Sequence, residues 1–304
     1  MRGGFLRDAI ETRSYYERGM NTIRTVKEMQ AASSAIKGLS RRVALVPTMG
    51  ALHEGHAQLM RQAREEGAAV VVSVYVNPTQ FGPHEDLQHY PRDLGADEQL
   101  CNREKVDVVF APSDDEMYPG GLGSAHAAAT WVEETILSRR FEGERRPGHF
   151  RGVCTVVAKL FHIVQPDLAI FGQKDYQQLK VVQRMVRDLR FPIEIVSAPT
   201  VREPDGLALS SRNQMLSGAE RAQAAVLSKA LRVAHDLFHE GEQSAHRLEA
   251  AMQRTVSLAP ATRLDYAQIV DGETLEPVAK VQHGNVALIA AHLGKVRLID
   301  NAIL

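Results

Sequence analysis

The chain has 304 residues, 44% hydrophobic and 24% charged, and these proportions exclude a disordered or fibrous protein. Its 36 lysine and arginine residues nearly cancel its 37 aspartate and glutamate residues, so a nucleic-acid-binding protein with a molecule-wide basic face is not expected. No apolar run approaches the roughly 20 residues that a membrane-spanning helix needs.

The N-terminal segment 1–19 mixes acidic and basic side chains and contains no apolar stretch. Neither a signal peptide nor a typical acid-poor transit peptide has this composition. The two cysteines, Cys101 and Cys154, are too few for a disulfide framework and lack the spacing of metal ligands. They fit a reducing compartment, so we expect a cytoplasmic protein that does not attach to a membrane.

From residue 43, short β-rich runs alternate with helical stretches. The predicted strands are 43–47, 69–76, 106–110, 167–171 and 193–198, and the predicted helices are 55–66, 95–104, 152–164 and 176–189. The uninterrupted apolar run 69–76 is typical of a strand buried on both faces of a parallel sheet. The alternation therefore predicts an α/β fold with a doubly wound parallel sheet.

After Arg202 the pattern changes. A loop rich in Pro, Gly and Ser leads into one long alanine-rich helix, and a second helix and two β-like runs follow. Their predicted limits are 218–240, 244–258, 264–270 and 285–291. We therefore expect an N-terminal extension (1–19), a nucleotide-binding domain (20–202) and a smaller C-terminal α+β domain (203–304).

The segment PTMGALHEGH (47–56) joins a predicted strand to a predicted helix. Ligands bind outside the carboxyl ends of strands in open parallel sheets, and a helix N-terminus presents unpaired N–H groups to an anion. His53 and His56 are three residues apart, so both rings can lie on one edge of the first turn and donate to phosphate oxygens. The alternative is an ordinary strand–helix corner with two surface histidines.

The segment FGQKDYQQL (171–179) also follows a predicted strand. Lys174 offers an ammonium group to phosphates, and Asp175 can bind ribose hydroxyls. In the alternative interpretation Asp175 caps the next helix and Lys174 is solvated.

A third segment, DGLALSSRN (205–213), places Ser210, Ser211 and Arg212 together as an anion clamp. Its alternative is a hydroxyl-rich cap for the alanine-rich helix.

Two glutamines, Gln80 and Gln178, offer amides that can donate to and accept from a hydroxy acid. Each could instead be an ordinary polar residue, with Gln80 facing solvent. Taken together, the three phosphate-type segments and the two amides indicate a nucleotide beside a small polar acid, without identifying that acid.

PTMGALHEGH, YVNPTQF, RPGHFRGV, FGQKDYQQL and DGLALSSRN, in this order, resemble the pantothenate synthetase family. The resemblance runs from about Met20 to the C-terminus, whereas the HxGH pattern alone would indicate only the wider nucleotidyltransferase superfamily. It implies a Rossmann-like N-terminal domain, a C-terminal lid and a homodimer. It also implies that the chain uses ATP and Mg²⁺ to condense pantoate with β-alanine through a pantoyl adenylate, giving pantothenate, AMP and pyrophosphate.

The resemblance also implies roles for individual residues. His56 would be the proton donor, Gln80 would contact pantoate and β-alanine, and Gln178 would contact pantoate; no residue is assigned as a Mg²⁺ ligand. The implied ATP-binding residues are Met49, Gly50, Ala51, Leu52, His53, Glu54, Gly55, His56, Gly172, Gln173, Lys174, Asp175, Val201, Leu209, Ser210, Ser211 and Arg212.

The chain departs from the family in two places. Many members have Glu at the position of Gln173, where the backbone and the neighbouring Lys174 should matter more than the side chain. Members usually begin near Met20, so the resemblance supplies no role for residues 1–19. The loop 81–93 and the Ser210–Arg212 segment are the expected covers of the site.

Two rival functions remain at the level of sequence. A nucleotidyltransferase that adenylylates another small acid or a nucleotide would need a further cationic pocket for its acceptor, and the neutral Gln80 and Gln178 suit pantoate better. A tRNA-binding module is disfavoured by the neutral overall charge and by the absence of an appended basic segment.

Overall fold

The computed structural model describes residues 19–83, 85, 87–122 and 128–304. The predicted extension 1–19 therefore lies, apart from Gly19, outside the described residues. The chain forms two compact units: one comprises the chain up to Phe171 with Val181–Ala198, and the other comprises Gly172–Lys180 with Pro199–Leu304. The domain limits 20–202 and 203–304 remain predictions.

The first unit contains a six-stranded sheet with the order β1-β4-β3-β2-β5-β6. Parallel pairing joins β1 to β4, β4 to β3, β3 to β2 and β2 to β5. The strands are β1 (Asn21–Ile23), β2 (Val43–Thr48), β3 (Ala69–Val74), β4 (Val108–Phe110), β5 (Leu168–Gly172) and β6 (Glu194–Ala198). The chain runs outward from β2 to β3 and β4 on one side and to β5 and β6 on the other, which confirms the predicted doubly wound α/β fold.

Helices cover both faces of this sheet. Ala44 and Val46 of β2 pack in one buried cluster with Met60 of α3, and Cys101 of α4 belongs to the same cluster. The helices α2 and α7 contact each other and β2, and because alternate strand residues point to opposite faces they cover the other face. The helices of this part of the chain are α2 (Val26–Gly38), α3 (Glu54–Glu65), α4 (Leu94–Arg103), α5 (Asp114–Met117), α6 (Glu142–Arg145), α7 (His149–Val164) and α8 (Tyr176–Asp188).

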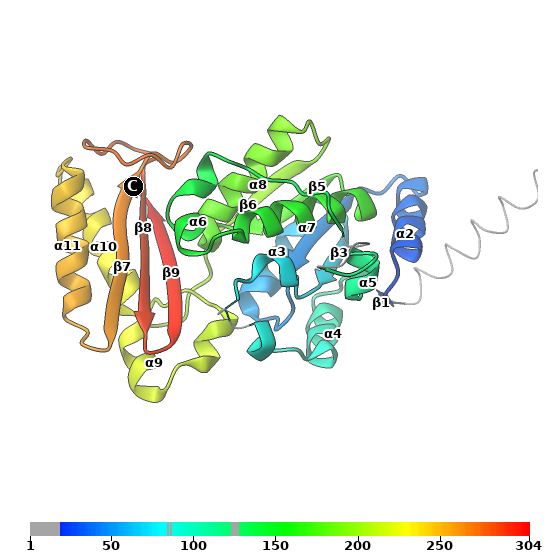
Figure 1. Cartoon of the computed structure of the whole chain (residues 1–304), viewed down its shortest axis with the longest axis horizontal. Coiled ribbons are helices and arrows are strands. Elements are labelled where there is room, and N and C mark those ends of the chain that lie inside the picture. The colour runs from blue at the N-terminus through cyan, green and yellow to red at the C-terminus, as the bar shows by residue number, and fades with distance from the viewer. Residues whose placement is uncertain (1–18, 84, 86, 123–127) are drawn as a thin grey trace, which may run out of the picture. The chain divides into compact units, whose positions relative to one another are not determined.

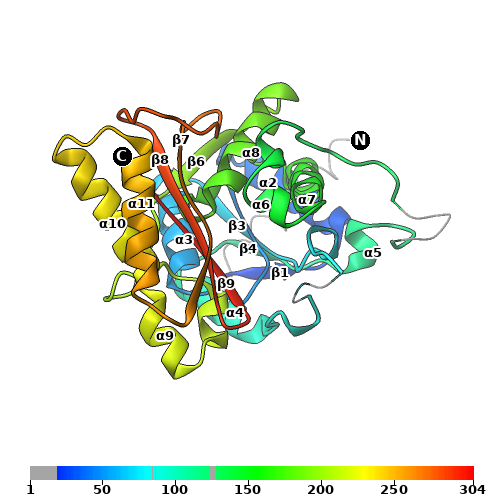
Figure 2. The ribbon, with the colours of Figure 1, turned by 60° about the vertical axis from the view of Figure 1, so that its left-hand side comes forward.

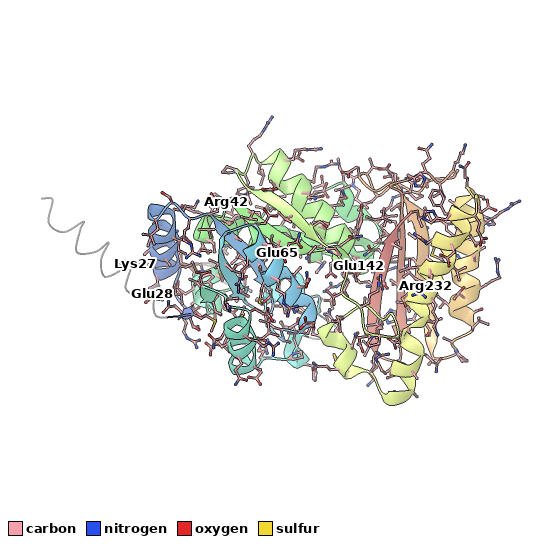
Figure 3. All side chains as sticks on the ribbon, turned by 180° about the vertical axis from the view of Figure 1, so that it is seen from behind. Lys27, Glu28, Arg42, Glu65, Glu142 and Arg232 are labelled. Atoms are coloured by element: carbon pink, nitrogen blue, oxygen red, sulfur yellow. The ribbon has the colours of Figure 1, made fainter. Side chains whose placement is uncertain are left out.

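Two local features explain why these segments take their observed places. The strand β3 is buried along Ala69–Ser73, as its uninterrupted apolar run predicts for a strand covered on both faces. The helix α2 buries Met29 and Ile36, while Lys27 and Glu28 lie on its exposed side (Figure 3). β1 and α2 precede residue 43 and are additional to the predicted elements.

The second unit is the predicted small α+β domain. Its three antiparallel strands, in the order β7-β8-β9, are covered on one face by two helices (Figures 1 and 2). Leu231, Leu248 and Ile289 belong to the buried cluster between helices and sheet. The elements are α9 (Gly218–Ala224), α10 (Val226–His239), α11 (Ala245–Ser257), β7 (Thr262–Val270), β8 (Val286–Leu293) and β9 (Val296–Ile303).

The predicted single helix 218–240 is wrong. The helix ends at Ala224 and resumes at Val226, with Ala225 at ψ −7°. Alanine has the highest intrinsic helix propensity, and no Gly or Pro marks the break, so the local sequence predicts a continuous helix. Ala224 and Ala225 are both buried, so the interruption lies in the packed interior of the unit.

The last strand, β9, is a further addition. Its sequence VRLIDNAI carries Asp300 and Asn301, which are 4% and 2% exposed. Two consecutive buried polar residues break the apolar pattern from which a strand is predicted. Both side chains have hydrogen-bond partners in the second unit: Asp300 accepts from Arg202, and Asn301 donates to the backbone of the candidate-site residues Gln173 and Lys174.

Candidate active site

The turn between β2 and α3 depends on Gly50. Gly50 has φ +79°, and a Cβ atom there would stand 2.8 Å from Asp97 Oδ2 and 3.1 Å from Val74 Cγ1. Ala51 also has a positive φ, of 50°. Only glycine fits at position 50, because the left-handed backbone disfavours a Cβ atom and the neighbouring Asp97 carboxylate leaves no space for it.

Asp97 of α4 holds this turn in place. Its carboxylate accepts hydrogen bonds from the amides of Ala51 (3.1 Å) and Leu52 (2.7 Å), and the residue is only 2% exposed. Burial raises the pKa of Asp97, while the amides of Leu52 and Ala51 act in the opposite direction. No motif in the sequence points to Asp97; the signal that could have found it is its position four residues before Cys101, on the same buried side of α4.

Replacing Asp97 with Asn should lower the free energy of unfolding by about 2–3 kcal/mol, since one amide N–H would then face an NH₂ group instead of an acceptor. Urea unfolding measures the loss. The matched control is Asp93→Asn on the same helix, where Asp93 only caps the amide of Ala96 and Asn caps equally well. Equal stability of Asp97→Asn and Asp93→Asn would show that the Asp97 carboxylate does not hold the turn in place.

His53 and His56 form a reciprocal cap at the start of α3. The Nδ1 atom of His53 accepts from the amide of Gly55 (3.1 Å), and Nδ1 of His56 accepts from the amide of His53 (3.2 Å). The ring centroids are 4.1 Å apart, so the structure brings the two imidazoles together as predicted. Because each Nδ1 is an acceptor, each neutral ring carries its proton on Nε2 and can donate from there.

The expectation that this helix start offers unpaired amides to an anion is wrong for most of the turn. The amides of Gly50, Ala51, Leu52, His53, Gly55 and His56 each donate to an acceptor within the protein. The local hydrogen bonds fix the shape of the turn and use up these donors. An anion at this turn would therefore be recognised by the imidazole rings and the field of the helix rather than by these amides.

Gln80 is buried, with 7% of its surface exposed, so the alternative of an amide facing solvent is wrong. It ends the 3₁₀ helix Pro78–Gln80, where Oε1 accepts from Asn77 Nδ2 at 3.2 Å and Nε2 donates to Met49 Sδ. Asn77 in turn accepts from the Tyr118 hydroxyl at 2.8 Å. These bonds orient the Gln80 amide and place it beside Met49. Asn77 and Tyr118 are positioning residues that the sequence pattern did not identify.

The backbone of Gln80 is held from α7 and the segment before it. His149 Nδ1 lies 2.9 Å from the Gln80 carbonyl oxygen, and Arg146 Nη1 lies 3.1 Å from His149 Nε2. Arginine can only donate, so Nε2 accepts and Nδ1–H donates to the carbonyl. Burial and the neighbouring Arg146 charge lower the pKa of His149 to about 4. His149 therefore stays neutral in the folded protein at neutral pH.

This lowered pKa predicts a loss of stability in mild acid. Unfolded His149 takes up its proton near pH 6.5 but folded His149 only near 4, so its contribution is complete above 6.5 and is lost as the pH falls towards 4. The loss approaches about 1.4 kcal/mol per pH unit within this window. His149→Asn keeps a donor for the carbonyl and removes the titration. Urea unfolding across the window should give a shallower pH dependence for this variant, and equal slopes would contradict the prediction.

An open cavity of about 430 Å³ adjoins the same turn in the first unit. Met49 and Gly50 line one side of it, and the described part of the predicted cover loop supplies Leu87, Pro91 and Arg92. His84 and Asp86 of that loop lie outside the described residues. The cavity is thus bounded both by the turn after β2 and by the segment that follows Gln80.

The remaining predicted residues lie in the second unit. Gln173–Asp175 form a 3₁₀ helix whose backbone is fixed from β9, since Asn301 Nδ2 donates to the carbonyl oxygens of Gln173 and Lys174, both at 2.9 Å. Lys174 Nζ lies 3.5 Å from Asp175 Oδ1. Gly172 precedes this turn, and Gln178 is the third residue of α8 and half-buried. The buried Asn301 thus positions a motif that lies far from it in sequence.

Val201 and Leu209–Arg212 form a second backbone cluster in this unit. The amide of Leu209 donates to the Val201 carbonyl at 2.9 Å. Ser210 caps the 3₁₀ helix Ser211–Met215, whereas Ser217 caps α9, so the Ser210–Arg212 segment is not the cap of the alanine-rich helix. Arg202 forms a two-point ion pair with the buried Asp300, at 2.6 and 2.9 Å. Asp300 and Asn301 of β9 therefore hold two segments in place: Asp300 binds Arg202, which follows Val201, and Asn301 binds the backbone of the Gln173–Asp175 turn.

The predicted residues fall into two groups. The first unit brings together Met49–His56 and Gln80. The second unit holds Gly172–Asp175, Gln178, Val201 and Leu209–Arg212. Chemically, the first group offers two imidazole donors and one oriented amide, and the second offers an ammonium, a guanidinium and hydroxyls suited to phosphates.

Comparison with known proteins gives a consistent result. A family model described as pantoate-beta-alanine ligase matches residues 21–303. The pantothenate synthetase of Thermotoga neapolitana is 51% identical over 285 residues, which cover 94% of this chain and 100% of the relative. That of Rubrobacter xylanophilus is 52% identical over 284 residues, covering 93% of this chain and 98% of the relative.

Two solved structures extend the likeness. The pantothenate synthetase of Thermus thermophilus has a TM-score of 0.87 and 47% identity, covering 93% of this chain and 99% of its own. The pantoate-beta-alanine ligase of Francisella tularensis, complexed with beta-gamma ATP and beta-alanine, has a TM-score of 0.75 and 34% identity, with coverages of 93% and 97%.

Proposed function

Because the chain belongs to the pantoate-beta-alanine ligase family, we propose that it joins pantoate to β-alanine at the expense of ATP, through a pantoyl adenylate. The observation that carries the chemistry is the reciprocal His53–His56 cap at the carboxyl end of β2, in which each Nδ1 accepts an amide, so that each neutral ring carries its proton on Nε2. The Francisella tularensis relative, complexed with beta-gamma ATP and beta-alanine, supports the choice of ATP and β-alanine as substrates.

The reaction has two steps. In the first, a carboxylate oxygen of pantoate attacks the α-phosphorus of ATP, a new O–P bond forms, and the bond to the bridging oxygen breaks to release pyrophosphate. In the second, the β-alanine amine attacks the acyl carbon, the C–O bond to AMP breaks, and the amine loses a proton. Orienting the acid and excluding water raise the rate of both steps and protect the adenylate.

We assign the nucleotide to the residues implied by the resemblance. Met49–His56 would contact ATP from the first unit, with His56 donating a hydrogen bond, and ultimately a proton, to oxygens that gain charge in the first step. Gly172–Asp175, Val201 and Leu209–Arg212 are the other ATP-binding residues that the resemblance implies. Lys174 and Arg212 supply the positive charge that offsets the phosphates.

Mg²⁺ fits this proposal as an ion that arrives with the nucleotide. Among the described residues no group of three or more His, Cys, Asp or Glu side chains is placed to hold a metal ion. Mg²⁺ typically binds through substrate phosphates and keeps several waters, so a dedicated cage of side chains is not required. Bound to the triphosphate, the ion would offset charge on the departing pyrophosphate.

We further propose that the enzyme acts in the cytoplasm as a homodimer. Within the described part of the chain, no helix combines the length and the apolarity needed to cross a bilayer. The two cysteines, Cys101 and Cys154, are free and buried, which suits a reducing compartment.

An ATP–pyrophosphate exchange assay with a panel of acids tests the function. Exchange should depend on pantoate, and nicotinate mononucleotide and amino acids should give none. Exchange with a nucleotide or another acid, but not with pantoate, would favour the rival nucleotidyltransferase. Formation of AMP should then require β-alanine in addition to pantoate.

Gln80 should contact both acids, and Gln178 should contact pantoate. Replacing Gln80 with Ala should raise the KM for pantoate and for β-alanine about ten- to a hundredfold, because one hydrogen bond to a charged group is worth roughly 1.5–3 kcal/mol. The KM for ATP should stay near its normal value. Steady-state kinetics with each substrate varied in turn measures the three values, and a change confined to ATP would contradict this placement.

A further inference from the structure

The last turn of α10 carries two histidines that face each other. His235 and His239 are four residues apart, their Nε2 atoms are 3.0 Å apart, and their ring centroids are 4.2 Å apart. Both rings are accessible: the His235 side chain is 44% exposed, and His239 lies on the exposed surface. Residues at this spacing lie on one face of a helix, so the pair is preorganised by the helix itself.

A neighbouring carboxylate sets the orientation of one ring. Asp236 Oδ1 lies 3.4 Å from His235 Nδ1. This carboxylate favours the proton on Nδ1 of His235, so the Nε2 lone pair points towards His239. A carboxylate behind an imidazole is the arrangement that orients and strengthens histidine ligands of metal ions. Without a metal, His239 donates its Nε2–H to that lone pair.

The distance between the two nitrogens matches that of two ligands of one ion. Zn–N bonds are about 2.0–2.1 Å long, and two such nitrogens lie about 2.9 Å apart at 90° and about 3.3 Å apart at the tetrahedral angle, so the observed 3.0 Å lies within this range. Imidazole nitrogens suit Zn²⁺, Ni²⁺ and Cu²⁺, whereas Mg²⁺ prefers oxygen ligands. A cation at this position would also interact favourably with the C-terminal end of α10, which ends at His239.

We propose that His235 and His239 form a two-histidine binding site for a borderline divalent transition metal ion such as Zn²⁺ or Ni²⁺. No group of three potential metal-ligating side chains gathers anywhere in the described ranges, so water completes the coordination. The pair lies on α10 of the second unit, and neither histidine is among the residues assigned to ATP. Binding here stabilises the last turn of α10, since a ligand that binds only the folded state raises its stability.

Titration of Ni²⁺ into the full-length chain without an affinity tag tests the proposal. Calorimetry at neutral pH in excess Mg²⁺ should show one Ni²⁺ site that Mg²⁺ does not displace. His235→Gln and His239→Gln keep a polar side chain on the exposed face of α10, and each should weaken the binding at least tenfold. Ni²⁺ should also raise the melting temperature of the wild type, and this increase should be lost in both variants.

The matched control is His246→Gln on α11, an exposed histidine of the same unit. This variant should bind Ni²⁺ as the wild type does and keep the same increase in melting temperature. Equal Ni²⁺ affinity in the wild type and in both α10 variants would overturn the proposal. A comparable loss in His246→Gln would overturn it as well, because the ion would then be bound elsewhere.

Discussion

Replacing His56 with Asn is expected to slow adenylate formation about 100- to 1,000-fold while the fold stays as stable as the wild type to within about 0.5 kcal/mol. The Asn side chain places an oxygen where His56 Nδ1 accepts the amide of His53, so the reciprocal cap is kept. It has no group at the position of Nε2–H. Pantoate-dependent release of pyrophosphate in a single turnover measures the rate of the first step.

Two companion variants separate the cap from the chemistry. His56→Ala should lose both the cap, at about 1 kcal/mol, and the rate. His56→Gln reaches towards the Nε2 position with an N–H donor and should recover part of the rate lost in His56→Asn. ATP affinity should change little in all three variants, because the donor acts on charge that develops in the transition state. A normal rate of adenylate formation in His56→Asn would show that His56 only caps the helix and takes no part in the reaction.

The sequence predicted the parts of the fold that depend on local composition. Apolar runs such as 69–76 are typical of strands covered on both faces, and β3 is buried in that way. The break at Ala225 and the strand β9 depend on tertiary partners. An alanine-rich run carries no signal for its own interruption, and Asp300 and Asn301 look unlike strand residues until Arg202 and the backbone of Lys174 are in place.

The site shows the same limit at the level of single atoms. The spacing of His53 and His56 predicted two neighbouring rings, but the assignment of Nδ1 as acceptor in both requires the actual hydrogen bonds. Asp97 reads as an ordinary helix residue in the sequence, because its role depends on two amides more than forty positions away. Polar residues that act through distant backbone groups leave no periodic pattern to detect.

Gly152 is the position where a single methyl group is expected to disturb both the fold and the site. It lies on α7, against the 3₁₀ helix that ends at Gln80. An added Cβ would stand 2.4 Å from the Thr79 carbonyl oxygen and 2.7 Å from Gln80 Cα, both backbone atoms that no rotamer change can move. The Gly152 carbonyl also accepts a hydrogen bond from Asn77, which orients the Gln80 amide.

Gly152→Ala should therefore lower the free energy of unfolding by about 3 kcal/mol, although alanine normally stabilises a helix interior relative to glycine. Because a shift of about 1 Å at a substrate contact costs on the order of 100-fold in rate, pantoate-dependent turnover should fall by a similar factor. Urea unfolding and exchange kinetics, corrected for the folded fraction, measure the two effects.

Gly38→Ala, at the end of α2, is the matched control, since no atom lies within 4 Å of its added Cβ. This variant should be neutral or more stable by up to about 1 kcal/mol. If Gly152→Ala is as stable as Gly38→Ala, the close approach of α7 to Gln80 does not contribute to the free energy of unfolding. If Gly152→Ala is destabilised but the folded fraction turns over normally, the contact serves the fold alone, and the position of Gln80 does not depend on it.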